Sequence, residues 1–271
     1  MRTVTTIEAV RATLAPHRGS GPIGLVPTMG ALHAGHLALI AAAREECETV
    51  VVSLFVNPSQ FGSGEDLDRY PRDPERDGEL SAAAGADLLF APSAAEMYPE
   101  GFQTAVDVRE MSRGLEGDIR PGHFSAVATV CLKLLNIVRP DRAYFGQKDA
   151  QQLAVVEQLV RDLDVEVELR SVATVRDEDG LALSSRNVYL TPDQRASARA
   201  LPRALEAGLA AYRNGIGHPD VVARTILLGE RDAVIDYCEL ARWNGQLVLA
   251  AAIRLGETRL LDNVVLEGAQ T

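Results

Sequence analysis

The first two thirds of the chain alternate short, continuous apolar runs with longer segments of helical periodicity. The apolar runs predict buried strands at Ile23–Val26, Val50–Val56, Asp87–Phe90, Arg142–Phe145 and Glu166–Val172. The periodic segments between them predict helices at His36–Cys47, Asp77–Ala84, His123–Val138 and Ala150–Asp162. Strands that are apolar throughout and separated by helices are typical of a parallel sheet covered on both faces. The pattern therefore predicts a Rossmann-like, doubly wound α/β fold, which binds ligands at the carboxyl ends of its strands.

The pattern changes near residue 175, which predicts a second, smaller α+β domain. A long Ala-rich helix is expected over Thr191–Tyr212, with Thr191 as N-cap, Pro192 at the first position and Gln194 completing a capping box. A further helix is expected at His218–Leu228 and strands at Ala233–Leu240, Leu247–Ile253 and Thr258–Leu266. We place the boundary at 174/175, so that residues 1–174 form the Rossmann-like domain and 175–271 the smaller one.

The charge and the cysteines exclude several classes of protein. A net charge of −11 and a pI near 5.0 are unfavourable for a general binder of nucleic acid or of anionic membranes. The three cysteines are far apart and show no CxxC spacing, so neither a disulfide framework nor a thiolate zinc site is indicated. The longest apolar run, Leu247–Ile253, is too short to cross a bilayer, and the opening residues do not resemble a signal peptide. We expect a cytoplasmic protein.

One glycine pattern is misleading. Gly19, Gly21 and Gly24 satisfy G-x-G-x-x-G, but they precede the carboxyl end of the first expected strand instead of following it. They therefore cannot form the turn that carries a pyrophosphate onto a helix, and the chain also contains no P-loop motif.

The strongest candidate site is the segment PTMGALHAGH at 27–36, directly after the first buried strand. Its glycines allow the backbone to approach a ligand closely, and it leads into a helix N-terminus that favours an anion. His33 and His36 are three residues apart, so one helical turn places both imidazoles on one side, where they can donate hydrogen bonds to phosphates. The alternatives are a histidine-bearing turn that only packs, or a two-histidine metal site. A metal site would need a third ligand, and no HExxH-type glutamate is present.

Three further motifs are weak when each is taken alone. Gly146-Gln147-Lys148-Asp149 follows the fourth expected strand and holds one of the chain's two lysines, against 25 arginines. Leu183-Ser184-Ser185-Arg186-Asn187 offers two hydroxyls and a guanidinium, which together suit a phosphate. Asn57 and Gln60 lie in NPSQF after the second strand and can hydrogen-bond a substrate. An ordinary polar turn remains the alternative for each.

The order of these motifs resembles the nucleotidyltransferase superfamily and, within it, the pantothenate synthetase (pantoate–β-alanine ligase) family. The segments that carry the resemblance are PTMGALHAGH at 27–36, FVNPSQFGSGEDLDRYPR at 55–72, RPGHF at 120–124, FGQKDAQQ at 145–152 and LSSRN at 183–187. The resemblance extends over roughly Ile23 to Leu190, and TRLLDN at 258–263 is similar as well.

The resemblance implies a two-step, ATP-dependent ligase that makes a pantoyl adenylate and then joins it to β-alanine, and it implies Mg²⁺ and a homodimer. It implies catalytic roles for His33, His36, Lys148 and Arg186, and assigns Gln60 and Gln152 to pantoate or β-alanine. Arg120 and His123 are placed near β-alanine or pyrophosphate. No direct metal ligand of the protein is expected. The ATP-binding set that it implies is Met29, Gly30, Ala31, Leu32, His33, Ala34, Gly35, His36, Gly146, Gln147, Lys148, Asp149, Val175, Leu183, Ser184, Ser185 and Arg186.

Two positions depart from the common patterns. Arg186 replaces the lysine of the superfamily's KMSKS loop, and Ala150 stands where the family commonly has an aromatic residue. Two other functions remain open: a nucleotidyltransferase that transfers AMP to a phosphorylated acceptor, and a nucleotide sensor without catalysis. The Gly-rich segment 61–73 is predicted to act as a lid, because an acyl adenylate must be kept from water.

Overall fold

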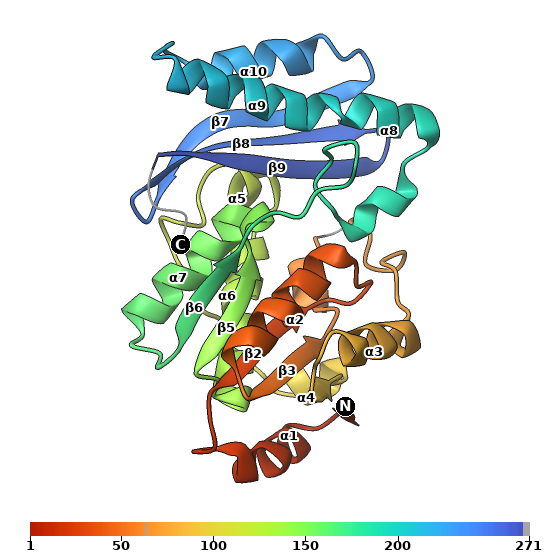
Figure 1. Ribbon diagram of the computed structural model, residues 1–271, viewed down its shortest axis with the longest axis vertical. Coiled ribbons are helices and arrows are strands. Elements are labelled where there is room, and N and C mark those ends of the chain that lie inside the picture. Colours follow the sequence, from red (N-terminus) through yellow and green to blue (C-terminus); the bar gives the residue numbers. More distant parts are fainter. Residues whose placement is uncertain (63, 268–271) are drawn as a thin grey trace. The chain divides into compact units, whose positions relative to one another are not determined.

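The computed structural model describes residues 1–62 and 64–267, which form two compact units (Figure 1). The first unit contains Met1–Gly146 and Val155–Val172. The second contains Gln147–Ala154 and the chain from Ala173 onward. The segment Gln147–Ala154 lies before the boundary expected at 174/175, yet it groups with the second unit. Asn263 of the last strand of that unit binds the backbone of Gln147 and Lys148. None of the helices in the described part of the chain combines the length and the apolar character that a membrane span requires.

The first unit is built on a six-stranded sheet of order β1-β4-β3-β2-β5-β6, in which every neighbouring pair is parallel. The predicted parallel α/β architecture is confirmed. Strand order runs one way from β2 through β3 to β4 and the other way from β5 to β6, so the switch point lies between β2 and β5. The strands are β1 (Arg2–Val4), β2 (Ile23–Thr28), β3 (Thr49–Leu54), β4 (Leu88–Phe90), β5 (Arg142–Gly146) and β6 (Glu168–Val172).

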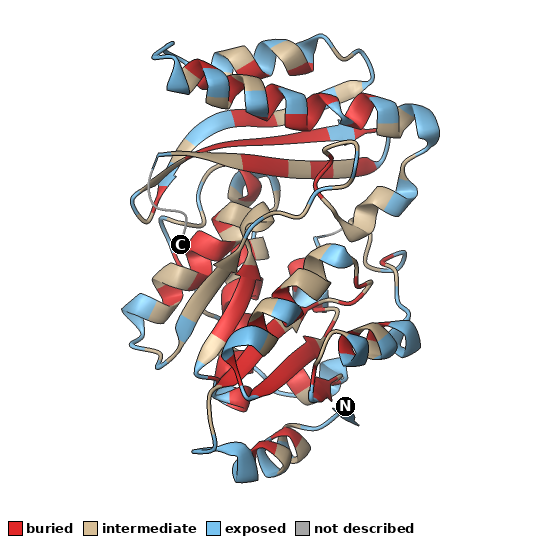
Figure 2. Ribbon diagram, viewed as in Figure 1, coloured by how far each residue is buried: buried red, intermediate tan, exposed pale blue. Residues whose placement is uncertain are grey.

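Helices cover the two faces of this sheet. Val26, Val50 and Val52 pack under α2 (Ala34–Glu46), while Leu25 and Val51 alternate with them and are fully buried on the opposite side. The central strands are buried along their length (Figure 2), as the continuous apolar runs predict. The other helices are α1 (Ile7–Leu14), η1 (Ala15–His17), η2 (Pro58–Gln60), α3 (Pro74–Ala83), α4 (Ala94–Met97), α5 (Glu116–Ile119) and α6 (His123–Val138). η3 (Gln147–Asp149) belongs to the second unit, and α7 (Ala150–Asp162) begins in the second unit and ends in the first.

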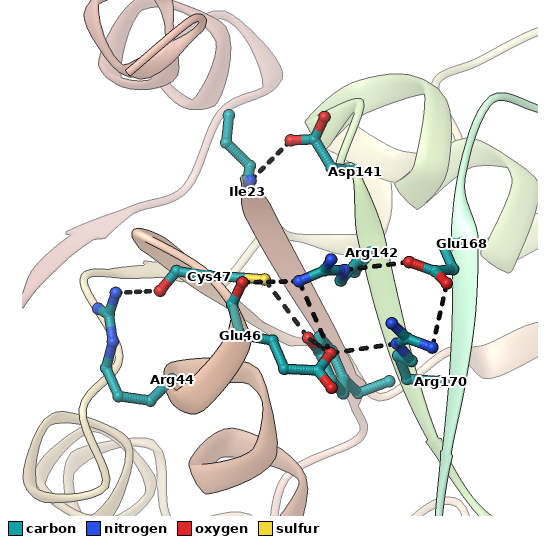
Figure 3. A network of polar contacts seen from close by, with 9 residues as sticks. Ile23, Arg44, Glu46, Cys47, Asp141, Arg142, Glu168 and Arg170 are labelled. Carbon is teal, nitrogen blue, oxygen red and sulfur yellow. Dashed lines mark hydrogen bonds and ion pairs between the residues drawn. The ribbon is translucent and has the colours of Figure 1, made fainter. Parts of the chain in front are cut away.

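A polar network joins the end of α2 to the amino ends of β5 and β6 (Figure 3). The Tyr144 hydroxyl donates to Glu46 at 2.8 Å, and Arg170 Nε donates to the same carboxylate at 3.1 Å. The Tyr144 hydroxyl and the two arginines, Arg142 and Arg170, hold the pKa of Glu46 below its usual value. Because the strands are parallel, this edge is opposite to the edge where the motif loops begin. The network therefore serves the fold rather than the site.

The second unit packs helices against one face of an antiparallel three-stranded sheet, β7-β8-β9. Leu201 and Leu205 of α9 contact a core that includes Leu249 and Leu260 of the sheet. This is the predicted smaller α+β domain. Its elements are η4 (Ser185–Tyr189), α8 (Pro192–Ala198), α9 (Ala200–Arg213), α10 (Pro219–Leu228), β7 (Ala233–Trp243), β8 (Gln246–Leu255) and β9 (Thr258–Glu267).

The single helix predicted over Thr191–Tyr212 is wrong, because the structure divides it at Arg199 into α8 and α9. Pro202 explains the division. A proline has no N–H to donate to the carbonyl four residues earlier, here that of Ala198, and its ring would clash with that carbonyl. The predicted start is confirmed: Thr191 and Gln194 form a capping box with Pro192 in the first turn.

Candidate functional site

The loop that follows β2 is held in an uncommon backbone conformation. Gly30 and the non-glycine Ala31 both have positive φ, +85° and +52°. A Cβ at Gly30 would lie 2.9 Å from Asp77 Oδ2 and 2.9 Å from Leu54 Cδ1, so this position requires glycine. A left-handed non-glycine residue costs about 1–2 kcal/mol, so surrounding contacts must stabilise the loop.

Asp77 of α3 supplies those contacts. Its side chain accepts hydrogen bonds from the Ala31 amide at 3.0 Å and from the Leu32 amide at 2.8 Å. The residue is 2% exposed. A buried carboxylate therefore fixes the backbone immediately before the two histidines. Sequence analysis missed this role, because nothing in the local pattern of α3 distinguishes Asp77 from its charged neighbours.

His33 and His36 form a reciprocal cap at the N-terminus of α2. His33 is the N-cap residue, and its Nδ1 accepts from the Gly35 amide at 3.1 Å. The His33 amide in turn donates to His36 Nδ1 at 3.3 Å. The two ring centroids are 4.1 Å apart. The helix begins at Ala34, slightly earlier than predicted, and the two imidazoles lie on one side as the spacing predicts.

This cap fixes the tautomer of both rings. A neutral imidazole has one acceptor nitrogen and one N–H, and in each ring the acceptor is Nδ1. Nε2 is therefore the protonated nitrogen in both. Two Nε2–H donors and the positive end of the α2 dipole are features that suit a polyphosphate.

Asn57 and Gln60 form a buried amide pair beyond the carboxyl end of β3. Asn57 Nδ2 donates to Gln60 Oε1 at 3.0 Å, and the Ser59 hydroxyl donates to Asn57 Oδ1 at 2.7 Å. Because Oε1 accepts from Asn57, Gln60 Nε2 is oriented as a donor for an acceptor oxygen.

Arg120 and His123 bind the backbone of Gln60. Its carbonyl accepts from Arg120 Nη2 at 3.0 Å and from His123 Nδ1 at 3.0 Å. Arg120 also pairs with Glu65 through Nε and Nη2, at 2.9 and 2.6 Å. Burial, followed by the nearby Arg120 charge, lowers the pKa of His123 to about 4, so this imidazole is neutral at physiological pH. Both residues therefore position Gln60.

In the second unit, the Lys148 turn is η3, and it is held from β9. Asn263 Nδ2 donates to the carbonyl of Gln147 at 2.9 Å and to that of Lys148 at 2.8 Å. Lys148 Nζ lies 3.7 Å from Asp149 Oδ1, and 19% of the lysine side chain is exposed. The lysine is thus partly shielded by the protein, unlike one on an ordinary solvated turn.

The segment that carries Ser184, Ser185 and Arg186 follows a small hairpin. The Leu183 amide donates to the Val175 carbonyl at 3.0 Å, and the Ser184 hydroxyl accepts from the Arg186 amide at 3.3 Å as N-cap of η4. The hairpin therefore brings together Val175 and Leu183, two members of the predicted ATP-binding set.

The predicted residues are divided between the two units. The first unit contains Gln60, the 29–36 loop and Gly146, while the second contains Gln147, Lys148, Asp149, Ala150, Gln152 and the 175–186 segment. Residue 63 of the predicted lid lies outside the described residues. Within residues 1–62 and 64–267, no group of three His, Cys, Asp or Glu side chains is arranged to hold a metal ion.

Comparisons with known proteins agree over almost the whole chain. Residues 2–265 match the family model described as pantoate-beta-alanine ligase. A pantothenate synthetase from Moorella thermoacetica is 50% identical over 280 residues, covering 98% of this chain and 99% of the relative. A crystal structure of the Thermus thermophilus pantothenate synthetase superposes with a TM-score of 0.93 at 48% identity, covering 99% of this chain and 100% of that one. A Francisella tularensis pantoate-beta-alanine ligase, complexed with beta-gamma ATP and beta-alanine, superposes with a TM-score of 0.84 at 34% identity and covers both chains completely.

Proposed function

We propose a two-step course of reaction for this chain, which belongs to the pantoate-beta-alanine ligase family and is a ligase that joins pantoate to β-alanine with ATP. In the first step a pantoate carboxylate oxygen attacks the α-phosphorus of MgATP. The bond from that phosphorus to the bridging oxygen breaks, and pyrophosphate leaves. In the second step the amine of β-alanine attacks the carbonyl carbon of the pantoyl adenylate, loses a proton and displaces AMP. The product is pantothenate.

The observation that carries the first step is the reciprocal cap of His33 and His36. In-line displacement at phosphorus needs positioning and charge stabilisation rather than covalent help from the protein. Two Nε2–H donors at a helix N-terminus meet that need at the departing pyrophosphate. His36, in the first turn of α2, is the better placed to donate a proton to the leaving oxygen.

The backbone around these histidines is proposed to cradle the nucleotide. Met29 and Gly30 contact it through the main chain, and Ala34 and Gly35 open the helix. The amides of Ala31 and Leu32 already donate to Asp77. Their part is therefore to shape the loop rather than to donate to ATP.

Cationic and hydroxyl groups of the second unit are proposed to bind the phosphates. Lys148 stabilises charge that grows during transfer, and Arg186 supplies the charge that a lysine provides in the KMSKS loop. The hydroxyls of Ser184 and Ser185 bind phosphate oxygens. Gly146, Gln147, Asp149, Val175 and Leu183 complete the ATP-binding set.

Gln60 and Gln152 are proposed to hold pantoate as neutral partners. The donor orientation of Gln60 Nε2 suits a carboxylate or hydroxyl oxygen of that substrate. Mg²⁺ enters with ATP as part of the substrate, bound by phosphate oxygens. We further propose a cytoplasmic homodimer.

ATP–pyrophosphate exchange tests this course directly. Exchange should require pantoate and Mg²⁺ but not β-alanine, because adenylation precedes attack by the amine. Exchange that depends on β-alanine would overturn the two-step course. Exchange that needs a phosphorylated acceptor instead of pantoate would indicate a different nucleotidyltransferase, and ATP binding without any exchange would indicate a sensor.

A further inference from the structure

Two consecutive polar residues interrupt the last strand of the second unit. Asp262 and Asn263 lie in the middle of β9, and they are 1% and 8% exposed. Burying an ionised or amide side chain is unfavourable unless its hydrogen bonds are satisfied. Both side chains find partners outside the sheet: Asn263 binds the Lys148 turn, and Asp262 binds Arg176 in the hairpin that leads into the Ser184–Arg186 segment.

Asn263 binds the Lys148 turn. One amide nitrogen donates to two successive carbonyls, those of Gln147 and Lys148, at 2.9 and 2.8 Å. An NH₂ group has two hydrogens, so a single side chain satisfies both carbonyls and fixes the direction in which the Lys148 side chain leaves the backbone. No aliphatic residue at position 263 could do this.

Asp262 binds the hairpin that precedes Ser184. Its carboxylate pairs with Arg176 through two short contacts, Nη1 to Oδ2 at 2.6 Å and Nη2 to Oδ1 at 3.1 Å. Arg176 also donates to the Gly180 carbonyl across the hairpin and pairs with Ala182 in a β-bridge. The hairpin is thereby held at the point from which the Ser184–Arg186 segment continues.

The alternation of side chains along β9 assigns the two motifs to opposite faces of the strand. Leu260 and Val264 pack in the core under α9, and Asp262 shares their face by the period of two. Leu181 of the hairpin belongs to the same core. Asn263 points to the other face, where η3 lies. Neighbouring residues of one strand therefore hold the two motifs in a fixed relation to each other.

We infer that Asn263 is a positioning residue for Lys148. Together with Asp262, it lets β9 hold both the Lys148 turn and the hairpin that leads into the Ser184–Arg186 segment. This rests on the proposed function of Lys148 at the phosphates. Asn263 binds the backbone of the Lys148 turn rather than the lysine ammonium. It acts by holding the backbone of the lysine, so its loss displaces a charge that must be aligned in the transition state. A misplacement of about 1 Å costs on the order of 10²-fold in rate.

A double-mutant cycle in the full-length enzyme tests the inference. Asn263→Asp keeps the size of the side chain, but a carboxylate cannot donate to either carbonyl. We expect kcat for ATP–pyrophosphate exchange to fall about 10²-fold while the KM for ATP changes far less. Lys148→Ala should lower kcat by about 10²–10³-fold, and adding Asn263→Asp to it should cause no further loss. Asn263→Ala, which places no charge against the carbonyls, is the second variant if Asn263→Asp does not fold.

Asn244→Asp is the matched control. Asn244 also donates from Nδ2 to the segment 147–154, but to the Ala154 carbonyl at 3.4 Å and away from the lysine. It should retain normal exchange. If Asn263→Asp has a normal kcat while Lys148→Ala has a greatly lowered one, the inference is overturned and the proposed role of Lys148 stands. The same conclusion follows if Asn263→Asp lowers kcat by an equal factor in the presence and in the absence of Lys148. A Lys148→Ala enzyme of normal kcat would overturn the proposed role of the lysine and the inference with it.

Discussion

Asp77 and Leu32, 45 residues apart, are joined by a hydrogen bond of 2.8 Å in which the Leu32 amide donates to a buried carboxylate. The same carboxylate accepts from Ala31, whose φ of +52° lies in the left-handed region. One side chain thus stabilises a strained turn directly before the histidine pair. Strain of this kind persists only where the surroundings over-determine it, and it is common at functional sites.

Replacing Asp77 with Asn should lower both stability and turnover. Asn has a single acceptor oxygen, so one of the two amides loses its partner and faces an NH₂ group instead. We expect a loss of about 1–3 kcal/mol in the free energy of unfolding, and a kcat that falls more than the KM for ATP rises. Chemical denaturation and exchange kinetics measure the two effects.

Asp73→Asn is the control for this change. Asp73 caps the same helix by accepting from the Arg76 amide, and Asn caps a helix about as well as Asp. The control should behave as wild type. Equal behaviour of the Asp73 and Asp77 variants would show that the carboxylate does not hold the histidine loop.

His33→Asn separates the two roles of His33. The Asn side chain can still accept from the Gly35 amide and cap α2, but it has no group in the place of Nε2–H. Thermal stability should change little, while kcat for exchange should fall about 10²–10³-fold, as for the loss of one strong donor to developing charge. A variant with normal kcat would limit His33 to capping.

The sequence was sufficient for most of the fold, because the apolar runs are periodic and local. β2, α2, α6 and β5 lie where their patterns predict them, to within about two residues. The helical periodicity of Thr191–Tyr212 runs past Pro202, but a proline is accommodated only in the first turn of a helix, so α9 begins anew at Ala200. Local chemistry therefore determines these elements, and it also determines the division between α8 and α9.

The supports of the site were harder to predict, since they depend on residues that meet only in the folded chain. Asp77 reaches the loop 45 residues before it, and Asn263 reaches the Lys148 carbonyl 115 residues away. Asn263 did leave a signal, because two polar residues in succession inside an apolar strand require buried partners. Asp77 left none, since a charged residue on a helix is usually a solvated one.

His123 should make stability depend on pH. Its pKa is lowered to about 4, mainly by burial and then by Arg120, and this is partly offset by the hydrogen bond to the Gln60 carbonyl and by the charges of Glu116 and Glu65. Between about pH 4 and the unfolded value near 6.5, the unfolded state binds more protons, so stability rises with pH through this window. The contribution lost on acidification across this window is about 3 kcal/mol at most, since each pH unit between the two pKa values is worth about 1.36 kcal/mol.

His123→Asn removes this titration and keeps a donor. Asn Nδ2 occupies the place of the imidazole Nδ1, so the hydrogen bond to the Gln60 carbonyl is retained. The free energy of unfolding of the variant should vary less with pH than that of the wild type between about pH 4 and 6.5. An unchanged slope would indicate that other groups govern acid unfolding.

The segment 61–73 supplies the last prediction, that it acts as a lid. Gly64 has a φ of +86°, and Gly62 is not among the residues of positive φ. Gly64→Ala is therefore strained even though no heavy atom lies within 4 Å of the added Cβ, while Gly62→Ala meets only the Glu65 side chain, at 3.4 Å or more. If the segment must order to keep water from the adenylate, Gly64→Ala should release AMP faster than pantothenate, and Gly62→Ala should be nearly normal. Hydrogen exchange of this segment should slow when the adenylate forms in the wild type and slow less in Gly64→Ala. Equal protection with and without the adenylate would mean that the segment is a static part of the surface.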